Sequence, residues 1–374
     1  MKVMTVIGTR PEIIRLSRVM ALLDKNLAHT IVHTGQNYDY ELNRIFFEDL
    51  ELRPPDFFLD AAGAGLAETI ANIISKTDLI LEKVRPDALL VLGDTNSALS
   101  VLPAKRRKIP IFHMEAGNRC FDQRVPEETN RKIVDHVADI NMPYSSLARE
   151  HLLREGLPPD RIVKTGSPMK EVLDHYRERI HASPVLREYG LAEKGYIVVS
   201  SHREENVDDD AHLAGLVATL NGLAEKYDVP LIVSTHPRTR KRFDARGVVL
   251  DPRVRISKPF GFCAYVRLQT SALLTVSDSG TITEESSILG FPAVNLREAH
   301  ERPEGMEEGV VPLAGLDPDR VLECAEMVIT RKRENRPMKI VEDYDVGNVS
   351  EKVLNVILSY TDYVNRVVWQ KKTP

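Results

Sequence analysis

The sequence has few cysteines and lacks any long apolar run, and each absence excludes a class of protein. Three cysteines occur among 374 residues, and their spacing matches neither a disulfide framework nor a metal or redox motif. No run approaches the roughly 20 apolar residues that a membrane-spanning helix needs. We therefore expect a cytoplasmic protein with reduced thiols, no signal peptide, no membrane anchor and no membrane partner.

An excess of positive charge is also absent. The formal net charge is −5 and 28% of the residues are charged, a balance typical of a globular protein and unlike that of a general nucleic-acid-binding protein. Basic clusters at residues 105–108, 238–242 and 331–336 lack interleaved aromatic residues. We expect these clusters on solvated surfaces, with a local phosphate contact as the alternative for one of them.

Strand-like apolar runs alternate with longer segments of helical period, which is the pattern of parallel sheets covered by helices. The expected strands lie at residues 2–8, 29–34, 87–93, 109–114, 139–143, 161–165, 196–200, 230–234, 272–277, 292–296 and 310–313. A polar stretch at residues 169–194 interrupts the alternation. The predicted fold class is α/β, with two doubly wound Rossmann-like domains, 1–168 and 195–356, joined by a linker helix and facing a cleft.

The first turn places an arginine at a helix start. Gly-Thr-Arg-Pro-Glu at residues 8–12 follows the first strand, and Pro11 favours the first position of a helix. Arg10 then lies beside backbone N–H groups that can bind a phosphate; alternatively, it caps a neighbouring helix. The turn lacks Gly-x-Gly-x-x-Gly, so no dinucleotide is predicted.

Acidic residues follow later strands of the first half. Asp94 and Glu115 stand directly after apolar runs, where desolvation can raise a carboxyl pKa toward the range of a general base. Asp94 equally fits the N-cap of the next helix, whereas Glu115, followed by Ala-Gly, fits a cap less well. Glu127 lies in Pro-Glu-Glu-x-Asn-Arg, which ends at Arg131, and its alternative role is that of an ordinary acidic residue in a first helical turn.

The second half carries similar turns. His202 and His236 each follow a strand, and His202, next to an arginine, is well placed to meet an anion. Ser279 and Gly280 form a small turn that leads into a helix, whose N–H groups suit a phosphate, while Glu285 suits ribose hydroxyls.

No metal is predicted. The residues His113-Met114-Glu115 resemble part of a zinc deaminase motif, but no Pro-Cys-x-x-Cys follows anywhere in the chain, and no other His or Cys spacing fits a metal site.

Taken in order, these motifs resemble the non-hydrolysing UDP-N-acetylglucosamine 2-epimerase family. The matching segments are Gly-Thr-Arg-Pro-Glu at 8–12, Gly-Asp-Thr at 93–95, Glu-Ala-Gly at 115–117, Pro-Glu-Glu-x-Asn-Arg at 126–131, His-Arg-x-Glu-Asn at 202–206, Asp-Ser-Gly at 278–280 and Glu-Arg-Pro-Glu at 301–304. The resemblance runs from residue 2 to about residue 310.

The resemblance implies a glycosyltransferase-B-type fold in which the C-terminal helix, residues 357–374, returns to the first domain, and it implies a homodimer. It assigns catalysis to the positions Asp94, Glu115, Glu127 and His202. It assigns UDP or substrate contacts to the positions Arg10, Arg15, Arg131, His236, Ser279, Gly280, Thr281, Glu285 and Arg302. Two of these depart from the family pattern, because Arg15 replaces a lysine and Thr281 replaces a second glycine.

The function implied is C2 epimerisation of UDP-GlcNAc to UDP-ManNAc for polysaccharide biosynthesis, by elimination and re-addition of UDP through a glycal and without a cofactor. Two segments, Asn-Ser-Ala-Leu at 96–99 and Asn-Arg-Cys-Phe at 118–121, resemble those of the UDP-N-acetyl-L-fucosamine synthase branch. Enzymes of this branch invert C2 of UDP-2-acetamido-2,6-dideoxy-L-talose. The alternatives from other classes are a glycosyltransferase of the same fold, a hydrolysing epimerase and a non-catalytic sugar-nucleotide sensor.

Overall fold

The computed structural model describes residues 1–35, 40–201, 209–235, 242–243, 246–298 and 302–371, without the side chains of residues 40–44. Its contacts divide the chain into two compact units. Unit 1 consists of Met1–His175 and Glu342–Pro374, and unit 2 consists of Tyr176–Val341. Among the described residues, no helix has the length and apolar content to cross a membrane.

Unit 1 is built on a parallel sheet of six strands with the order β3-β2-β1-β4-β5-β6. The strands are β1 (Lys2–Ile7), β2 (Ala28–His33), β3 (Phe57–Phe58), β4 (Ala88–Leu92), β5 (Ile111–Met114) and β6 (Ile140–Met142). The central strands are mostly apolar, because a parallel sheet is covered on both faces; β4 and β5 are buried along their whole length, and His113 on β5 is a buried exception to the apolar pattern.

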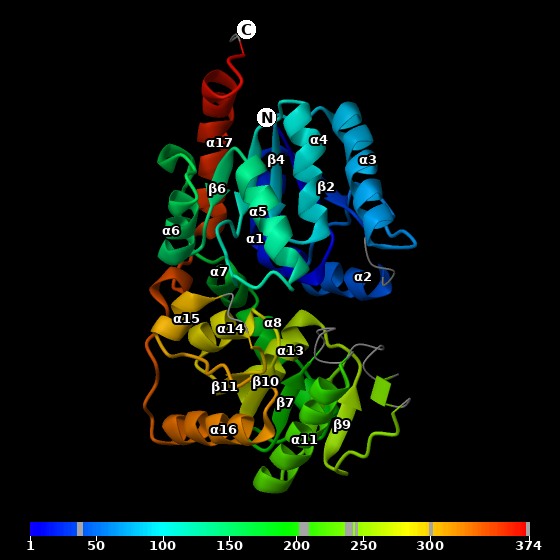
Figure 1. Ribbon diagram of the computed structural model, residues 1–374, viewed down its shortest axis with the longest axis vertical. Coiled ribbons are helices and arrows are strands. Elements are labelled where there is room, and N and C mark those ends of the chain that lie inside the picture. The colour runs from blue at the N-terminus through cyan, green and yellow to red at the C-terminus, as the bar shows by residue number, and fades with distance from the viewer. Residues whose placement is uncertain (36–39, 202–208, 236–241, 244–245, 299–301, 372–374) are drawn as a thin grey trace. The chain divides into compact units, whose positions relative to one another are not determined.

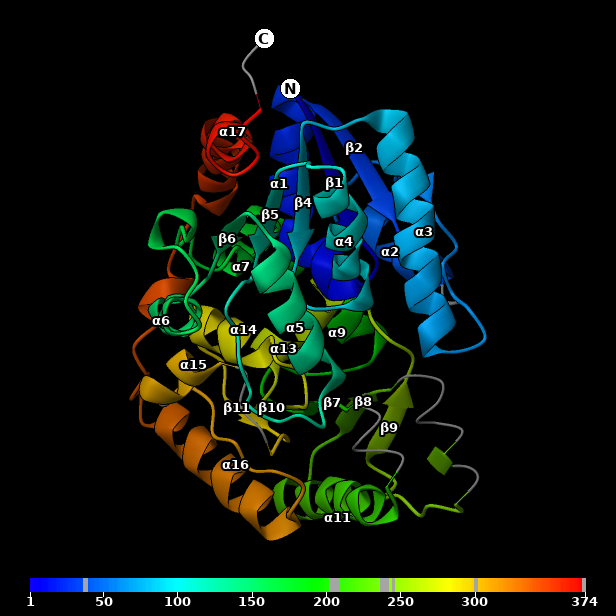
Figure 2. The same cartoon turned by 45° about the horizontal axis from the view of Figure 1, so that its top comes forward.

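Helices cover both faces of this sheet. They are α1 (Arg10–Asn26), α2 (Tyr40–Asp49), α3 (Leu66–Val84), α4 (Val101–Arg106), α5 (Pro126–Val137), α6 (Ser146–Arg154), α7 (Met169–His175) and α17 (Val349–Val367), with short 3-10 turns η1 (Asn96–Ser100), η2 (Pro159–Arg161) and η3 (Glu342–Tyr344). One core cluster joins the sheet to α3, α4 and α5, which lie together on one side in Figure 2. The final helix, α17, packs on α1 (Figure 1).

Unit 2 repeats the architecture with a five-stranded parallel sheet of order β11-β10-β7-β8-β9. Its strands are β7 (Ile197–Ser200), β8 (Leu231–Ser234), β9 (Val254–Ser257), β10 (Leu274–Ser277) and β11 (Ala293–Asn295). Its described helices are α8 (Arg177–Ala182), α9 (Val185–Glu188), α11 (Asp210–Tyr227), α13 (Phe262–Ser271), α14 (Ile282–Leu289), α15 (Pro303–Glu307) and α16 (Pro318–Arg333).

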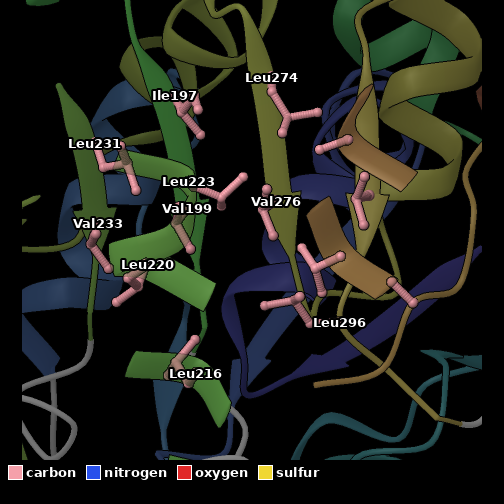
Figure 3. Packing of buried hydrophobic residues seen from close by; sticks show 14 of the residues in the cluster. Ile197, Val199, Leu216, Leu220, Leu223, Leu231, Val233, Leu274, Val276 and Leu296 are labelled. Atoms are coloured by element: carbon pink, nitrogen blue, oxygen red, sulfur yellow. The ribbon is translucent and has the colours of Figure 1, made fainter. Parts of the chain in front are cut away.

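Alternation along β7 distributes its side chains between two cores. Ile197 and Val199 join the cluster under α11 and α16, whereas Tyr196 and Val198 join the cluster under α9 and α13, as the two-residue period of a strand requires. Figure 3 shows the first cluster, with leucines of α11 lying over β7 and β8.

The predicted fold class is confirmed as α/β with two parallel, Rossmann-like sheets. Two predicted strands were wrong: residues 161–165 and 310–313 contribute only single bridges, at Ile162 and Leu313. Residues 310–313 leave the edge strand β11 after one pair, whereas residues 161–165 make a second backbone bond, from Thr165 to Pro143, only beyond the end of the edge strand β6. The strands β3 and β9 were not predicted, because β3 has only two residues and β9 is interrupted by the exposed Arg255.

The boundaries of the units differ from the predicted 168, 194 and 356. Residues 169–194 form three helices, and α7 stays with unit 1 because Glu171 accepts hydrogen bonds from the backbone N–H and the hydroxyl of Ser350, the former at 2.9 Å. The predicted boundary at 356 falls inside α17. The return to unit 1 occurs earlier, where the N–H of Ser167 donates to the carbonyl of Asp343 at 3.0 Å.

Candidate active site

The candidate site of unit 1 lies at the carboxyl ends of three neighbouring strands. Because β4 lies between β1 and β5 in the sheet, the turns that follow these strands meet at one edge. The turns carry Arg10, Asp94 and Glu115, so the fold gathers three predicted site residues that are far apart in the sequence.

Glu12 ties the first of these turns to the second. Its carboxylate accepts hydrogen bonds from the backbone N–H groups of Gly8 at 2.9 Å and Thr9 at 2.6 Å, and from the hydroxyl of Thr95 at 3.0 Å. The side chain is 1% exposed, and this burial raises the pKa of Glu12 to about 7, against the lowering effect of its hydrogen bonds. Glu12 was not predicted as a site residue, although its position three residues after Thr9 is that of a capping box.

The two arginines of α1 occupy different surroundings. The guanidinium carbon of Arg10 lies 5.8 Å from the centre of the Phe46 ring. Arg15 is buried, lies 5.6 Å from the centre of the Tyr144 ring and donates from Nη1 to Oε2 of Glu115 at 2.8 Å. The predicted binding residue Arg15 therefore contacts a predicted catalytic residue directly.

Glu115 stands in an unusual backbone conformation. Its φ of 63° lies in the left-handed region, which a residue with a side chain rarely adopts and which recurs at functional sites. Its carboxylate is 14% exposed and also accepts a long hydrogen bond, 3.4 Å, from the amide of Asn118. At Glu115 the backbone leaves the extended conformation of β5, and the carboxylate contacts Arg15.

Asp94 pairs with the other predicted arginine of this unit. Nε and Nη2 of Arg131 lie 2.9 Å and 2.7 Å from the same oxygen, Oδ2 of Asp94. Asn130, also on α5, donates to the backbone carbonyl of Asp94 at 3.0 Å. The side chain of Asp94 is 22% exposed, so a ligand can reach it, and the N-cap role that its sequence position allowed belongs instead to Thr95, whose hydroxyl accepts from Ser97 at 3.3 Å.

The acidic pair at the start of α5 divides into two roles. Glu127 is partly exposed in the first turn. Glu128 is fully buried, accepts from the backbone N–H of Cys120 at 3.1 Å and lies 3.2 Å from Nη1 of Arg131. Burial alone would raise the pKa of Glu128, but these contacts outweigh it and lower the pKa. Glu128 thus supports Arg131, a role that the sequence analysis did not identify.

The candidate site of unit 2 is the turn between β10 and α14. Ser279, Gly280 and Thr281 are partly exposed there. The turn is closed by side chains: the N–H of Ser279 donates to the hydroxyl of Ser277 at 3.0 Å, and the hydroxyls of Ser279 and Thr281 lie 3.0 Å apart. A threonine therefore occupies the position where the family pattern has a glycine, and its hydroxyl contributes to the turn.

Inside the first turn of α14, two glutamates are held by other elements. The amide of Gln269 on α13 donates to Oε2 of Glu285 at 2.6 Å. Glu284 is fully buried and lies 3.5 Å from Nη2 of Arg302. The predicted residues Glu285 and Arg302 are consequently fixed in orientation, and Gln269 is a further residue that the sequence analysis missed.

The predicted residues His202 and His236 lie outside the described residues. Within the part of the chain that the structure describes, no group of three or more His, Cys, Asp or Glu side chains is arranged to hold a metal ion.

The chain is similar over most of its length to proteins of known family. The family model described as UDP-N-acetylglucosamine 2-epimerase matches residues 21–358. The solved structure of UDP-N-acetylglucosamine 2-epimerase from Rickettsia bellii is 49% identical to this chain, covers 99% of it and 100% of its own chain, and superposes with a TM-score of 0.91. The crystal structure of the Methanocaldococcus jannaschii UDP-GlcNAc 2-epimerase in complex with UDP-GlcNAc and UDP is 32% identical, covers 96% and 100% of the two chains, and has a TM-score of 0.89.

A relative with another substrate name is similarly close in sequence. The UDP-2,3-diacetamido-2,3-dideoxy-D-glucuronate 2-epimerase of Pseudomonas aeruginosa is 34% identical over 331 residues, which are 87% of this chain and 91% of the relative.

Proposed function

Since this chain belongs to the UDP-N-acetylglucosamine 2-epimerase family, we propose that it inverts C2 of UDP-N-acetylglucosamine without hydrolysis and forms UDP-N-acetylmannosamine. One observation carries this proposal: Asp94 and Glu115 follow neighbouring strands, and each is ion-paired with an arginine, Arg131 or Arg15. Two such carboxylates provide the two proton-handling groups that inversion at a carbon requires.

The reaction has to begin at the bond between the sugar and UDP. The C2 proton is not next to a carbonyl and is not acidic, so it leaves only as the C1–O bond to UDP breaks. The C2–H electron pair then becomes the C1–C2 double bond of a glycal, and the C1–O electron pair departs with the diphosphate. In the return direction a proton adds to the opposite face of C2, and the diphosphate oxygen bonds to C1 again.

The carboxylates Asp94 and Glu115 serve as the acid and base of these two proton transfers, with Glu127 as a third acidic group in the same unit. Arg15 and Arg131 orient the two carboxyl groups and compensate the negative charge of whichever one is ionised. The strained backbone at Glu115 is the kind of distortion that a site retains to aim a reacting group.

The departing diphosphate needs positive charge. We assign this role to Arg10 and His202, together with the N–H groups at Ser279, Gly280 and Thr281, because a helix start stabilises an anion. Glu285 is assigned to the ribose, and Gln269 holds its carboxylate in place. His236 and Arg302 are assigned to substrate contacts. The relative from Methanocaldococcus jannaschii, solved with UDP-GlcNAc and UDP, supports a UDP-sugar as the ligand.

The reaction as proposed consumes no oxidant or metal, so it needs no cofactor. We further propose a cytoplasmic homodimer whose product enters polysaccharide biosynthesis. Light scattering coupled to size exclusion tests the dimer directly: a mass of about 84 kDa, twice the 42.1 kDa of one chain, is expected, and 42.1 kDa contradicts it.

The experiment that tests the function is C2 exchange in D2O. The purified protein is incubated with UDP-GlcNAc and the C2 position is followed by NMR. Deuterium at C2 together with UDP-ManNAc supports non-hydrolysing epimerisation, whereas free ManNAc plus UDP indicates hydrolysis and contradicts it.

Substitutions of the two carboxylates test whether they carry out the deuterium exchange at C2. We expect Asp94→Asn and Glu115→Gln each to abolish exchange while UDP still binds. The matched control is Asp78→Asn, since Asp78 is an exposed carboxylate of unit 1 that is likewise paired with an arginine, Arg107. Loss of exchange in the control, or full exchange in both site variants, contradicts the assignment.

A second sugar is favoured by the segments at 96–99 and 118–121, which resemble the UDP-N-acetyl-L-fucosamine synthase branch. Inactivity with UDP-GlcNAc combined with C2 exchange on UDP-2-acetamido-2,6-dideoxy-L-talose assigns the chain to that branch. Inactivity with both sugars leaves a glycosyltransferase or a sugar-nucleotide sensor and overturns the proposed reaction.

A further inference from the structure

We propose that a buried, charged pair of His113 and Asp135 is a positioning device that fixes the turns of both Asp94 and Glu115. This inference rests on the proposed function, in which those two carboxylates handle the protons at C2. Neither His113 nor Asp135 needs to touch the substrate. Each acts by holding backbone that carries a catalytic residue.

The pair lies wholly inside unit 1. His113 is on β5 and Asp135 is on α5, and both side chains are 0% exposed. Nδ1 of His113 lies 3.0 Å from Oδ1 of Asp135, and Nε2 of His113 lies 2.8 Å from the backbone carbonyl of Gly93. Gly93 directly precedes Asp94, so the histidine links the helix α5 to the turn of the first carboxylate.

The surroundings of the ring determine its protonation. Both ring nitrogens face an oxygen at hydrogen-bond distance, and a carbonyl or a carboxylate can only accept. A neutral imidazole has one N–H, so it would leave one of these oxygens opposed by a lone pair. The imidazolium, with two N–H groups, donates from Nε2 to the carbonyl of Gly93 and places its positive charge beside the carboxylate of Asp135, 3.0 Å from Nδ1.

The other partners of Asp135 are donors as well. Its Oδ2 accepts from Nη1 of Arg119 at 2.7 Å, and the backbone N–H of Gly117 lies 3.2 Å from each of its oxygens. Both oxygens of Asp135 therefore face N–H groups of Arg119 and Gly117 in addition to the ring of His113. Arg119 in turn pairs with Glu155 at the end of α6 through two bonds of 2.8 Å and 2.6 Å.

Charges around His113 agree with this assignment. Burial alone would lower the pKa of His113, but the hydrogen bond and charge of Asp135 outweigh it. The carbonyl of Gly93 and the charge of Asp94 act in the same direction, and the pKa is raised overall. The charged groups near the ring are Asp135 from α5 and Asp94 from the turn after β4; Arg119 and Glu155 lie beyond Asp135.

The same carboxylate also anchors the turn of Glu115. The segment 115–119 is held by the bond from Gly117 to Asp135, by the bond from Arg119 to Asp135 and by His151, whose Nδ1 lies 3.0 Å from the carbonyl of Gly117. Asp135 thus connects to the first catalytic turn through His113 and to the second through backbone and Arg119. The buried pair of His113 and Asp135 therefore fixes the distance between the turn of Asp94 and the turn of Glu115.

Protonation is tested first, in the wild-type protein and without reference to activity. In ¹⁵N-histidine NMR at about pH 8, where an ordinary histidine is neutral, we expect the ring of His113 to keep two N–H groups. The variant Asp135→Asn offers an amide N–H to Nδ1 and should convert His113 to the neutral form. A neutral His113 in the wild type, or an unchanged ring in Asp135→Asn, overturns the charged pair.

Positioning is tested with two variants of His113 that separate its bonds. In His113→Gln the amide nitrogen takes about the position of the ring atom Nε2, so the contact with the carbonyl of Gly93 is kept. In His113→Asn the amide nitrogen takes about the position of Nδ1, so only the contact with Asp135 is kept. We expect His113→Asn to lower kcat by about 100-fold with KM changed much less, and His113→Gln to recover most of the loss. The control, His181→Gln, changes an exposed histidine of α8 in unit 2 and should keep the wild-type kcat.

Two measurements keep this test independent of folding and of the proposed reaction. UDP binding by calorimetry should be unchanged in His113→Asn, because the assigned UDP residues of unit 2 are untouched. Hydrogen exchange of residues 92–96 should be faster in His113→Asn than in His113→Gln. Equal exchange rates and a kcat within about threefold of the wild type overturn the positioning role. If the wild type shows no C2 exchange, the proposed function fails, and the NMR and hydrogen-exchange results still decide the pair.

Discussion

Arg131 directs two nitrogens at one oxygen of Asp94: Nε at 2.9 Å and Nη2 at 2.7 Å both meet Oδ2. The guanidinium is 4% exposed, and its Nη1 lies 3.2 Å from the buried Glu128. A planar group held on two sides by carboxylates sets the rotation of the Asp94 side chain.

The first prediction is that Arg131→Lys lowers kcat for C2 inversion by between about tenfold and about 100-fold. A lysine keeps the positive charge but offers a single nitrogen, so it cannot contact Asp94 and Glu128 with a rigid fork. Steady-state kinetics with the D2O exchange assay measure the effect. The control is Arg154→Lys, since Arg154 is an exposed arginine of α6 that pairs with Glu150, and an equal loss of kcat in both variants contradicts the argument.

The second prediction concerns Glu12 and pH. Its pKa is about 7 in the folded protein, against 4.5 for an ordinary glutamate, so between these values the folded state binds a proton that the unfolded state does not. Stability therefore falls as pH rises through this window, by roughly 3 kcal/mol in total. Glutamine keeps the hydrogen-bonding geometry without titrating.

Urea unfolding at pH values from 5 to 8 measures this contribution. The free energy of unfolding of the wild type should decline relative to that of Glu12→Gln over the range. Glu82→Gln, which removes an exposed carboxylate of α3, serves as the control and should follow the wild type. Parallel curves for the wild type and Glu12→Gln would show that Glu12 ionises normally.

The third prediction uses two glycines with nearly the same backbone. Gly117 and Gly156 have φ values of 83° and 86°, but a Cβ at Gly117 would lie 2.2 Å from the carbonyl oxygen of Ala148, whereas one at Gly156 would meet nothing within 4 Å. Gly156→Ala should therefore destabilise by about 1–2 kcal/mol, the strain of the left-handed backbone alone. Gly117→Ala should destabilise by about 3 kcal/mol or more and displace Glu115.

Thermal or urea unfolding of the two alanine variants, compared at one pH, tests this difference. Equal destabilisation would mean that helix α6, which carries Ala148, moves away without resistance.

The fourth prediction concerns the turn of unit 2. Glu285→Gln should weaken UDP binding by about tenfold or more, because a hydrogen bond to a charged acceptor is worth about 1.5–3 kcal/mol. Isothermal calorimetry measures the affinity. Glu323→Gln, on the exposed face of α16, provides the matched control, and an unchanged affinity in Glu285→Gln removes this residue from the proposed UDP contacts.

The spacing of apolar residues predicted those strands and helices that bury a long apolar face. Long apolar strands such as β4 and amphipathic helices such as α3 were identified because their patterns extend over many residues. The two-residue strand β3 carries too short a pattern to identify. The segment at 161–165 has a suitable composition but pairs at one position only, since pairing depends on a neighbour that composition does not specify.

The site was predictable where a residue follows a strand directly, as Asp94 and Glu115 do. Its supporting contacts were not predictable, because they join residues distant in sequence. Nothing in the spacing of His113 and Asp135, or of Gln269 and Glu285, indicates that they meet. Glu12 is the exception, because its capping-box position was readable beside Thr9.

The discontinuity of unit 1 has a consequence for synthesis on the ribosome. Unit 2, residues 176–341, is one continuous segment, whereas unit 1 needs both its first 175 residues and the segment from Glu342 onward. During translation unit 2 can fold as soon as residue 341 has left the exit tunnel, while the face of α1 that later receives α17 is still uncovered. The first part of the chain to be made is thus the last to be completed, and the nascent chain exposes an apolar helix face for as long as the intervening unit takes to be translated.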